Sequence, residues 1–172
     1  MDTIGENIKE VKPHVFTAVP RLLEKVYDKI IAKGNELEGF KRKLFFWAVE
    51  LAEEYDVQGK GLWYGIKLWI ARKLIFSKWM EALGGEVRAI ASGSAALSPH
   101  LCRIYLAAGI NVLEGYGLTE TSPVVSVNNL KDGIRIGTVG PLLDNVEVKF
   151  AEDGEILVKA PSVMIGYYNK PE

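Results

Sequence analysis

The sequence predicts an α/β fold: a parallel-sheet βαβ core with a helical N-terminal part and a small β-rich C-terminal part. Apolar residues recur at helical spacing in the first half of the chain, and two short apolar runs flank a helix-like segment in its centre. Near the end, apolar and charged residues alternate as in strands. We predict that residues 1–130 form the helical and α/β part and that residues 131–172 begin the β-rich part.

The N-terminal part is predicted to be helical. Residues 3–10 have the composition of a helix, and Pro20 begins a segment of helical spacing that Gly34 is expected to close. Apolar residues then step by three and four between 40 and 55, which is typical of an amphipathic helix. After a break at 56–61, a single long helix is predicted over 62–83.

The centre of the chain changes to a strand–helix–strand pattern. Residues 87–91 and 110–113 are predicted strands, and the helix between them begins with Ser98 as N-cap and ends at Gly109. Such a unit implies a parallel pair with a right-handed crossover. The loops 92–97 and 114–121 would then leave the carboxyl ends of neighbouring strands, the edge where open α/β sheets bind ligands.

The last part is predicted to be β-structure. Residues 124–127 form a candidate strand, and residues 146–150 and 155–159 form a hairpin that turns at Gly154.

Composition is that of a globular protein in a reducing compartment. The net charge is −1, so nucleic acid is not an expected partner, and 48% of residues are hydrophobic. The single Cys102 excludes an intrachain disulfide framework. The polar N-terminus has no signal-peptide pattern, and no apolar run reaches 18 residues. We expect a cytoplasmic location.

Residues 114–121 are the most informative stretch of the chain. Two glycines let the backbone turn and lie close to a ligand, while Tyr116 offers an aromatic face, Thr119 a hydroxyl and Glu120 a carboxylate. This set suits a nucleotide phosphate with its divalent ion. The alternative is a tight turn in which Thr119 and Glu120 cap a helix, and the residues alone leave both interpretations open.

Five segments in order resemble the adenylate-forming (acyl-CoA synthetase) enzymes, and the long-chain fatty acid CoA ligases most of all. Residues 114–124 (EGYGLTETSPV) resemble the adenine motif of that family, and residues 91–99 (ASGSAALSP) its small-residue loop beside the adenine and acyl pocket. The other three segments are 19–27, 154–158 and 164–168. The resemblance implies that the C-terminal β part is barrel-like.

The resemblance implies a nucleotide site. Tyr116 would stack on the adenine, with Gly93 along its other side, Glu114 would accept from the adenine amino group, and the Gly115 backbone would approach the purine. Thr119 would donate to the α-phosphate, and Glu120 would ligate Mg²⁺, which makes these two the implied catalytic residues. The implied nucleotide-binding set is Gly93, Ser94, Ala95, Glu114, Gly115, Tyr116, Gly117 and Thr119.

The implied reaction joins a fatty acid to AMP from ATP and then transfers the acyl group to CoA. Compared with the family, the chain covers a central part. The phosphate loop is expected upstream, and the ribose-binding Asp, the hinge and the C-terminal domain with its catalytic Lys downstream, so the 172 residues alone are expected to be inactive. The alternatives are another adenylate-forming acid–CoA ligase and a non-catalytic binding or membrane-associating module.

Residues 60–80 contain five cations, no acidic residue and three tryptophans. A basic aromatic amphipathic helix can lie on an anionic membrane surface, which suits an enzyme that takes insoluble fatty acids. The alternative is a core-facing helix with a basic solvent face. The cations are Lys60, Lys67, Arg72, Lys73 and Lys78.

Overall fold

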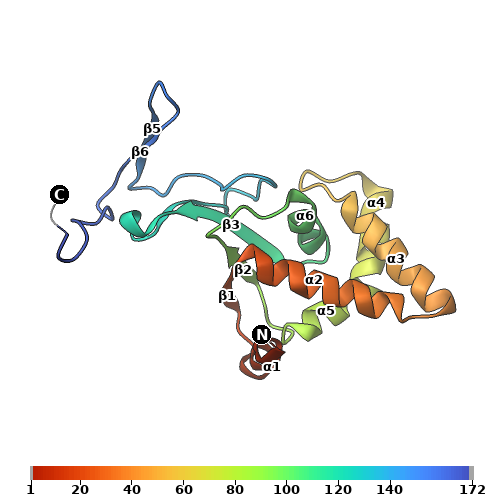
Figure 1. Cartoon of the computed structure of the whole chain (residues 1–172). Coiled ribbons are helices and arrows are strands. Elements are labelled where there is room, and N and C mark those ends of the chain that lie inside the picture. The colour runs from red at the N-terminus through yellow and green to blue at the C-terminus, as the bar shows by residue number, and fades with distance from the viewer. Residues whose placement is uncertain (1, 171–172) are drawn as a thin grey trace. The chain divides into compact units, whose positions relative to one another are not determined.

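A computed structural model describes residues 2–170 as two compact units, Met1–Val112 and Leu113–Glu172 (Figure 1). The division falls at Val112, whereas the sequence suggested a change of character near residue 130. Each unit is described separately below. The first is mostly helical with a small parallel sheet, and the second is made of strands and turns.

The first unit contains the predicted helices. The long segment after residue 61 is an α-helix, a π-helical turn and a second α-helix in succession rather than the single helix that we predicted. The elements are α1 (Asp2–Val11), α2 (Pro20–Asn35), α3 (Gly39–Glu53), α4 (Leu62–Ala71), the π-helix η1 (Arg72–Phe76), α5 (Ser77–Ala82) and α6 (Pro99–Ala107).

Aromatic side chains form much of the helical core. Phe76 is fully buried and meets the ring of Trp79 edge-on at 4.9 Å between centroids, and Trp79 in turn lies 6.4 Å from Phe45. Gly34 does not end its helix as predicted. It packs inside α2 against Phe45, whose ring would lie 2.1 Å from an added Cβ. The amphipathic pattern thus predicted α3 but did not include Phe45, which is the largest buried side chain of that helix.

The π-helical turn brings Arg72 to the end of α6. The Arg72 guanidinium donates to the carbonyls of Ala107 at 2.8 Å and Leu106 at 3.1 Å, which are the last carbonyls of that helix. A cation at a helix C-terminus satisfies orphan carbonyls and complements the helix dipole. Ser98, the predicted N-cap of α6, makes no side-chain capping bond, although Pro99 begins the helix as predicted.

The first unit also holds a parallel strand pair. The strand β1 (Val15–Ala18), which we did not predict, runs parallel to β2 (Ala89–Ser92) in the register Val15↔Ala89 to Ala18↔Ser92. The strand β3 (Asn111–Gly117) begins in this unit and is the neighbour of β2 in the strand order. The parallel-sheet core that the sequence predicted is therefore present.

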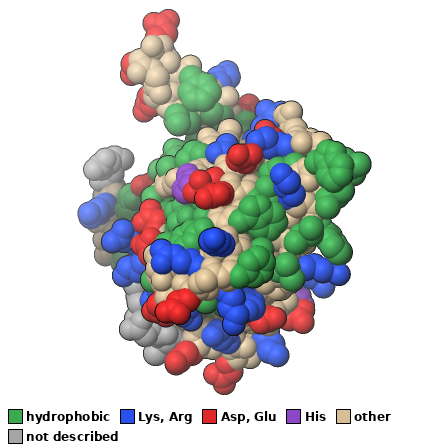
Figure 2. Space-filling model, turned by 90° about the vertical axis from the view of Figure 1, so that its right-hand side faces the viewer, with side chains coloured by type: hydrophobic (Ala, Val, Ile, Leu, Met, Phe, Trp, Pro, Cys, Tyr) green, Lys and Arg blue, Asp and Glu red, His purple; other side chains and the backbone are tan. Residues whose placement is uncertain are grey.

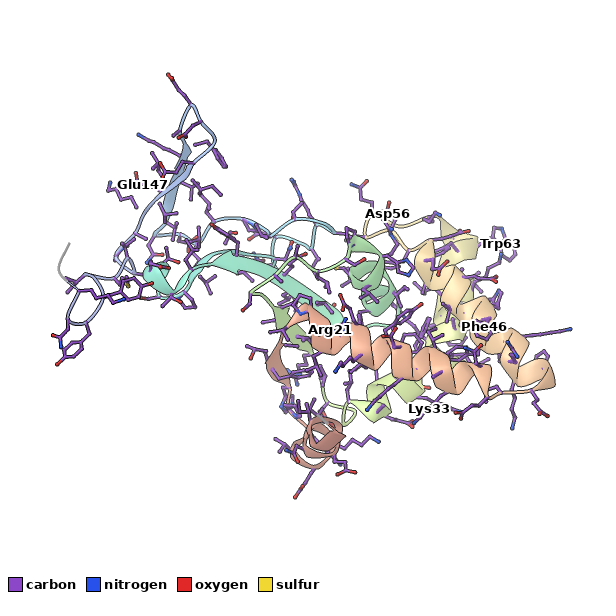
Figure 3. All side chains as sticks on the ribbon, in the orientation of Figure 1. Arg21, Lys33, Phe46, Asp56, Trp63 and Glu147 are labelled. Atoms are coloured by element: carbon purple, nitrogen blue, oxygen red, sulfur yellow. The ribbon has the colours of Figure 1, made fainter. Side chains whose placement is uncertain are left out.

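The second unit is built on an antiparallel pair. From Leu113 onward β3 belongs to this unit and pairs with β4 (Val124–Val127) through the 3₁₀ turn η2 (Thr119–Thr121). The predicted hairpin is formed by β5 (Glu147–Phe150) and β6 (Ile156–Lys159), with Lys159 paired to Glu147 at 2.9 Å (Figure 3). Residues 113–170 form no barrel, so the barrel-like expectation is not met within them.

Asn128 ties the segment after β4 to the end of β3. The buried side-chain amide of Asn128 donates to the Thr138 carbonyl at 2.6 Å and accepts from the Arg135 backbone N–H at 2.9 Å. The backbone N–H of Asn128 donates to the Glu114 carbonyl at 2.9 Å. A fully bonded buried amide of this kind fixes loop geometry. The segment 135–140 is thereby fastened beside the strand that carries the motif.

Candidate functional site

The motif begins inside a strand rather than in a loop. Because β3 continues to Gly117, side chains alternate through the motif, and Glu114 and Tyr116 lie on one face of the strand. Glu114 is buried at 5% exposure and Tyr116 is half-buried. The expectation of a loop from residue 114 was therefore wrong, but the strand places the two side chains implied to contact adenine on the same side.

The two motif glycines are required by the neighbouring strand. A Cβ at Gly117 would lie 1.8 Å from the carbonyl oxygen of Pro123, and one at Gly115 would lie 3.1 Å from that of Ser126. Both are backbone atoms; the contact at Gly117 could be relieved only by separating the strands, whereas at Gly115 a shift of a few tenths of an ångström would suffice. The glycines thus have an internal packing role, and an approach of the Gly115 backbone to a purine stays a prediction.

A buried hydroxyl holds the turn that follows. Thr121 is 4% exposed; its Oγ1 accepts from the Leu118 amide at 3.0 Å and donates to the Pro123 carbonyl at 2.6 Å. Ser122 adopts a left-handed conformation with φ 51° to close the turn. The sequence suggested Thr119 as a capping residue, but it is Thr121 that caps the turn. The resemblance did not assign a role to Thr121.

The turn leaves Thr119 and Glu120 at the surface. Thr119 is exposed, and its hydroxyl makes no hydrogen bond within residues 2–170. The Glu120 carboxylate accepts a hydrogen bond of 2.5 Å from the Tyr167 hydroxyl, and its backbone carbonyl accepts from the Met164 amide at 2.8 Å. The bond from Tyr167 lowers the pKa of Glu120 and keeps the carboxylate ionised. A donor hydroxyl and a charged carboxylate thus stand side by side.

The loop after β2 carries a buried hydroxyl of its own. Ser92 is 3% exposed, and its Oγ has no hydrogen-bond partner within the described part of the chain. Burying an unpaired hydroxyl costs about 1–3 kcal/mol. Ser94 follows with a positive φ of 70°, a conformation that serine adopts rarely, and Ser94 and Ala95 are exposed while Gly93 is half-buried. An unpaired buried hydroxyl next to a strained turn is a feature of ligand sites.

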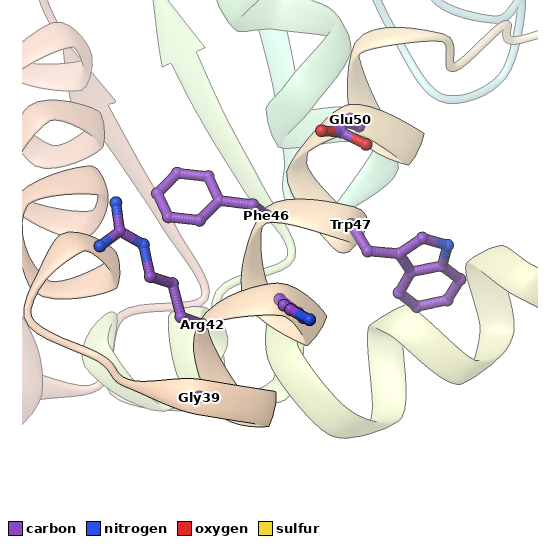
Figure 4. A pocket seen from close by; sticks show the side chains of 6 residues that line it. Gly39, Arg42, Phe46, Trp47 and Glu50 are labelled. Carbon is purple, nitrogen blue, oxygen red and sulfur yellow. The ribbon is translucent and has the colours of Figure 1, made fainter.

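One hollow of about 530 Å³ lies along α3 and includes none of the motif residues. It is lined by Gly39, Arg42, Lys43, Phe46, Trp47 and Glu50. Arg42 points to the same side as Phe46 and lies 5.6 Å from its ring centroid, whereas Trp47 points away from them (Figure 4). A single helix lines this hollow, so it is an open surface depression.

The segment after residue 61 exposes apolar side chains instead of burying them all. Leu68 and Trp79 face the core, but Trp63 is 77% and Trp69 57% exposed, and Trp63 projects from α4 in Figure 3. Figure 2 shows hydrophobic side chains among Lys and Arg on the face that lies to the right in Figure 1. The exposed apolar surface, here called the α4 face, comprises Leu62, Trp63, Ile66, Trp69 and Leu74.

Two of the five cations in this segment have structural partners. Arg72 binds the end of α6, and Lys60 pairs with Glu54 at 3.3 Å. Lys67, Lys73 and Lys78 are exposed, and Lys73 lies over the Trp69 ring at 4.5 Å. The alternative of a core-facing helix with a basic solvent face fits Leu68, Phe76 and Trp79, which are buried, whereas Trp63 and Trp69 are exposed.

Residues 2–170 contain no cluster of three or more His, Cys, Asp or Glu side chains able to hold a metal ion. None of the helices described in the structure is long and apolar enough to span a bilayer. Cys102 is buried and takes part in no disulfide.

The comparison with known proteins identifies the family of the chain. Residues 1–168 match the family of AMP-binding enzymes, and the chain belongs to that family. It is 38% identical over 165 residues to the long-chain-fatty-acid–CoA ligase FadD15 of Mycobacterium bovis, covering 94% of this chain. It is 34% identical to the long chain acyl-CoA synthetase 3 of Arabidopsis thaliana, covering 97%. The chain spans 27% of the length of each of these relatives.

Solved structures of similar fold are also CoA ligases. An anthranilate CoA ligase in complex with anthranoyl-AMP matches 98% of this chain with a TM-score of 0.56 and 17% identity. A long-chain-fatty-acid-CoA ligase from Archaeoglobus fulgidus matches 98% with a TM-score of 0.55 and 17% identity. The chain covers 26% and 29% of those two proteins. At these identities the likeness establishes the fold, and the resemblance noted in the sequence is confirmed.

Proposed function

We propose that this chain is the central part of an AMP-forming long-chain fatty acid–CoA ligase. Such an enzyme activates a fatty acid with ATP to an acyl-adenylate and transfers the acyl group to CoA. The observation that carries the proposal is the turn after β3. Thr121 fixes this turn internally, so that the Thr119 hydroxyl and the Glu120 carboxylate are both left at the surface.

The adenine end of the site is assigned to the face of β3. Tyr116 supplies a half-buried ring for stacking, and Glu114, two residues before it on the same face, supplies a buried carboxylate for the adenine amino group. Following the resemblance, Gly93, Ser94 and Ala95 are also assigned to nucleotide binding. The unpaired hydroxyl of Ser92 supports a polar ligand beside that loop, because a bond to such a ligand would remove its desolvation penalty.

The phosphate end is assigned to Thr119 and Glu120. Mg²⁺ takes oxygen ligands and is bound by one or two carboxylates together with substrate phosphates and water, so a single surface carboxylate fits it without a protein cluster. When bound, the ion would neutralise charge on the phosphates. Thr119 is free to donate to a phosphate oxygen, and the ionised Glu120 holds one oxygen of its carboxylate against Tyr167.

The substitution Glu120→Gln in a longer protein that contains this segment tests the assignment. Removing the charge should lower the rate of ATP–pyrophosphate exchange by about 10²- to 10³-fold, the range found when one electrostatic group is lost. Glu152→Gln, an exposed carboxylate in the turn of the β5–β6 hairpin, is the matched control and should leave the rate unchanged. Near-normal exchange by Glu120→Gln would refute the role of Glu120.

Substrate tests separate the proposal from its two rivals. Palmitate-dependent release of AMP supports a long-chain ligase, whereas AMP release with only short or aromatic acids would favour another acid–CoA ligase of the same family. If no acid supports pyrophosphate exchange although the protein binds ATP, the segment belongs to a non-catalytic binding module.

The 172 residues alone are proposed to be inactive. Catalysis by positioning requires the phosphate loop, the ribose-binding Asp and the catalytic Lys of the resembled family together with Thr119 and Glu120. We expect ATP binding in the millimolar range or weaker, about −4 kcal/mol or less favourable. Incubating this polypeptide with ATP, Mg²⁺, CoA and palmitate tests the expectation, and formation of acyl-CoA at a rate typical of an enzyme would overturn it.

We also propose that the α4 face contacts an anionic lipid surface, with the protein located in the cytoplasm. Three features support lipid: exposed Trp63 and Trp69, the exposed cations Lys67 and Lys73, of which Lys73 lies over the Trp69 ring, and the absence of any acidic residue between 60 and 80. The buried thiol of Cys102, the single cysteine of the sequence, is compatible with a reducing compartment. A fatty acid substrate would be available at such a surface.

Co-sedimentation with vesicles of neutral lipid, with and without 30% anionic lipid, tests the lipid contact. Binding should need the anionic lipid, weaken with salt, and fall when Lys67 and Lys73 are changed to Gln or Trp63 and Trp69 to Ser. Arg72 is left unchanged because it binds α6. The exposed pair Lys41 and Lys43 on α3, changed to Gln, is the control. Equal binding by wild type and the α4-face variants, or binding by neither, would show a solvated or protein-covered face.

A further inference from the structure

Tyr167 contacts the proposed metal ligand from a distant part of the sequence. Its hydroxyl donates to Glu120 Oε1 over 2.5 Å, although the two residues are 47 positions apart. A hydrogen bond to an ionised carboxylate is about twice as strong as one between neutral groups. This contact lies entirely within the second unit.

The backbone around the contact is anchored as well. The Met164 amide donates to the Glu120 carbonyl at 2.8 Å, so residues 164–167 hold Glu120 at both its main chain and its side chain. Thr121 fixes the same turn from its buried side. With its backbone fixed in this way, the remaining freedom of Glu120 lies in its side-chain torsions, and the bond from the Tyr167 hydroxyl restrains them.

We infer that Tyr167 is a positioning residue that orients the Glu120 carboxylate toward a divalent cation bound with nucleotide phosphate. The phenol occupies Oε1 and leaves Oε2 to face the ion. A ligand that is already oriented loses less rotamer freedom on binding, which raises its affinity without adding a contact. The inference rests on the proposed role of Glu120 as the Mg²⁺ ligand.

Tyr168 provides a control within the same segment. It is 92% exposed and forms no hydrogen bond within residues 2–170, whereas Tyr167 is 55% exposed and bonded to Glu120. Tyr167→Phe and Tyr168→Phe each remove one hydroxyl and keep the ring. A difference between the two variants therefore reports on the bond to Glu120 and not on a general loss of polarity.

The test measures binding of Mn²⁺, used as the probe ion, in the presence of a non-hydrolysable ATP analogue. The longer protein that contains this segment is titrated, and free Mn²⁺ is followed by its paramagnetic resonance signal. Tyr167→Phe should weaken Mn²⁺ binding about 5- to 10-fold, because the carboxylate is no longer oriented before the ion binds, and Tyr168→Phe should not change it. The KM for Mg²⁺ should rise by the same factor, with kcat at saturating Mg²⁺ nearly unchanged.

A double-mutant cycle with Glu120→Gln separates the inference from the proposed function. If Tyr167 acts through Glu120, its removal should have no further effect on Mn²⁺ binding once Glu120 is Gln. If Glu120→Gln alone leaves Mn²⁺ binding unchanged, the metal role of Glu120 fails and the inference fails with it. If Glu120→Gln abolishes binding while Tyr167→Phe equals Tyr168→Phe, the metal role stands and only the positioning role of Tyr167 is overturned.

Discussion

The helical core of the first unit and the motif turn of the second are held by different kinds of contact. In the first unit Phe45, Phe76 and Trp79 pack ring against ring. In the second, Gly117 lies against the backbone of Pro123, and Thr121 bonds to backbone groups on both sides of the turn. One region is stabilised by apolar side chains that can readjust, and the other by main-chain atoms that cannot.

This difference predicts where substitutions are tolerated. A side chain added in the helical region meets other side chains, as Gly34 does with the Phe45 ring, or meets nothing, as at Gly65. A side chain added in the motif turn meets carbonyl groups that are themselves hydrogen-bonded. The geometry that places Thr119 and Glu120 therefore depends on a few positions with little room for change.

The largest expected effect on stability is that of Gly117→Ala. The added Cβ would lie 1.8 Å from the Pro123 carbonyl oxygen, so β3 and β4 must separate, and we expect a loss of about 3 kcal/mol in the second unit. Gly65→Ala, within α4 and with no atom within 4 Å of the added Cβ, is the control and should stabilise the first unit by about 0.5–1 kcal/mol.

Hydrogen exchange by mass spectrometry measures the two effects separately. Residues 113–127 should exchange faster in Gly117→Ala. All four tryptophans lie in the first unit, so Trp fluorescence should show that this unit unfolds as in the wild type. Unchanged protection of 113–127 would mean that the motif turn can adapt, and the contrast between the two regions would then be lost.

The sequence was most informative where contacts are local. Helical spacing located α3 and the long segment after residue 61, and the turn at Gly154 located the β5–β6 hairpin. The pattern did not predict β1, because four residues between a helix and Pro20 give too short an alternation. It also gave no sign of the π-helical turn or of the bond from Arg72, its first residue, to the distant end of α6.

The sequence predicted which residues form the candidate site, but it did not predict the residues that hold them in place. The resemblance selected Thr119 and Glu120, whose roles stay predictions, and the family match covers residues 1–168 as a whole. Neither pointed to Thr121, Asn128 or Tyr167. These three act through bonds to main-chain groups or to residues as far as 47 positions away, and no local pattern records such bonds. The segment 164–168, one of the five that resemble the family, was the one signal that could have suggested a role for Tyr167.

Thr119 and Thr121 lie in the same turn, and replacing each of them should have different effects on stability. Thr121→Val removes the bonds to Leu118 and Pro123 and leaves the Pro123 carbonyl unpaired by a side chain, so we expect a loss of about 1–3 kcal/mol. Thr119→Val, at an exposed position, should change stability by less than about 0.5 kcal/mol. Urea unfolding followed by circular dichroism measures both values.

The effects on enzyme activity should be the reverse of the effects on stability: Thr119→Val should lose more activity than Thr121→Val. In the longer protein, Thr119→Val should slow pyrophosphate exchange although it folds normally, because a phosphate donor is lost. Thr121→Val should keep activity at temperatures where it stays folded. Equal stability losses for the two variants would show that the buried hydroxyl of Thr121 does not hold the turn.

The smallest expected effect concerns Tyr64 and the alkaline stability of the first unit. Its hydroxyl donates to the Leu51 carbonyl at 2.7 Å, joining α4 to α3, and burial, with a contribution from the charge of Glu54, raises the pKa of Tyr64 to about 12. The folded state therefore favours the protonated phenol relative to the unfolded chain, where the pKa is about 10. The resulting stability is fully present below pH 10 and is lost as the pH rises from about 10 to about 12.

Tyr64→Phe should cost about 1 kcal/mol at pH 8 through the lost bond and should make the decline above pH 10 shallower. Tyr105, whose pKa burial also raises, keeps part of that decline in both proteins. Urea unfolding of the first unit by Trp fluorescence between pH 8 and 11.5 provides the measurement. Identical slopes in the two proteins would mean that the Tyr64 phenol is no harder to ionise in the folded state than in the unfolded chain, and that the α3–α4 contact rests on apolar packing alone.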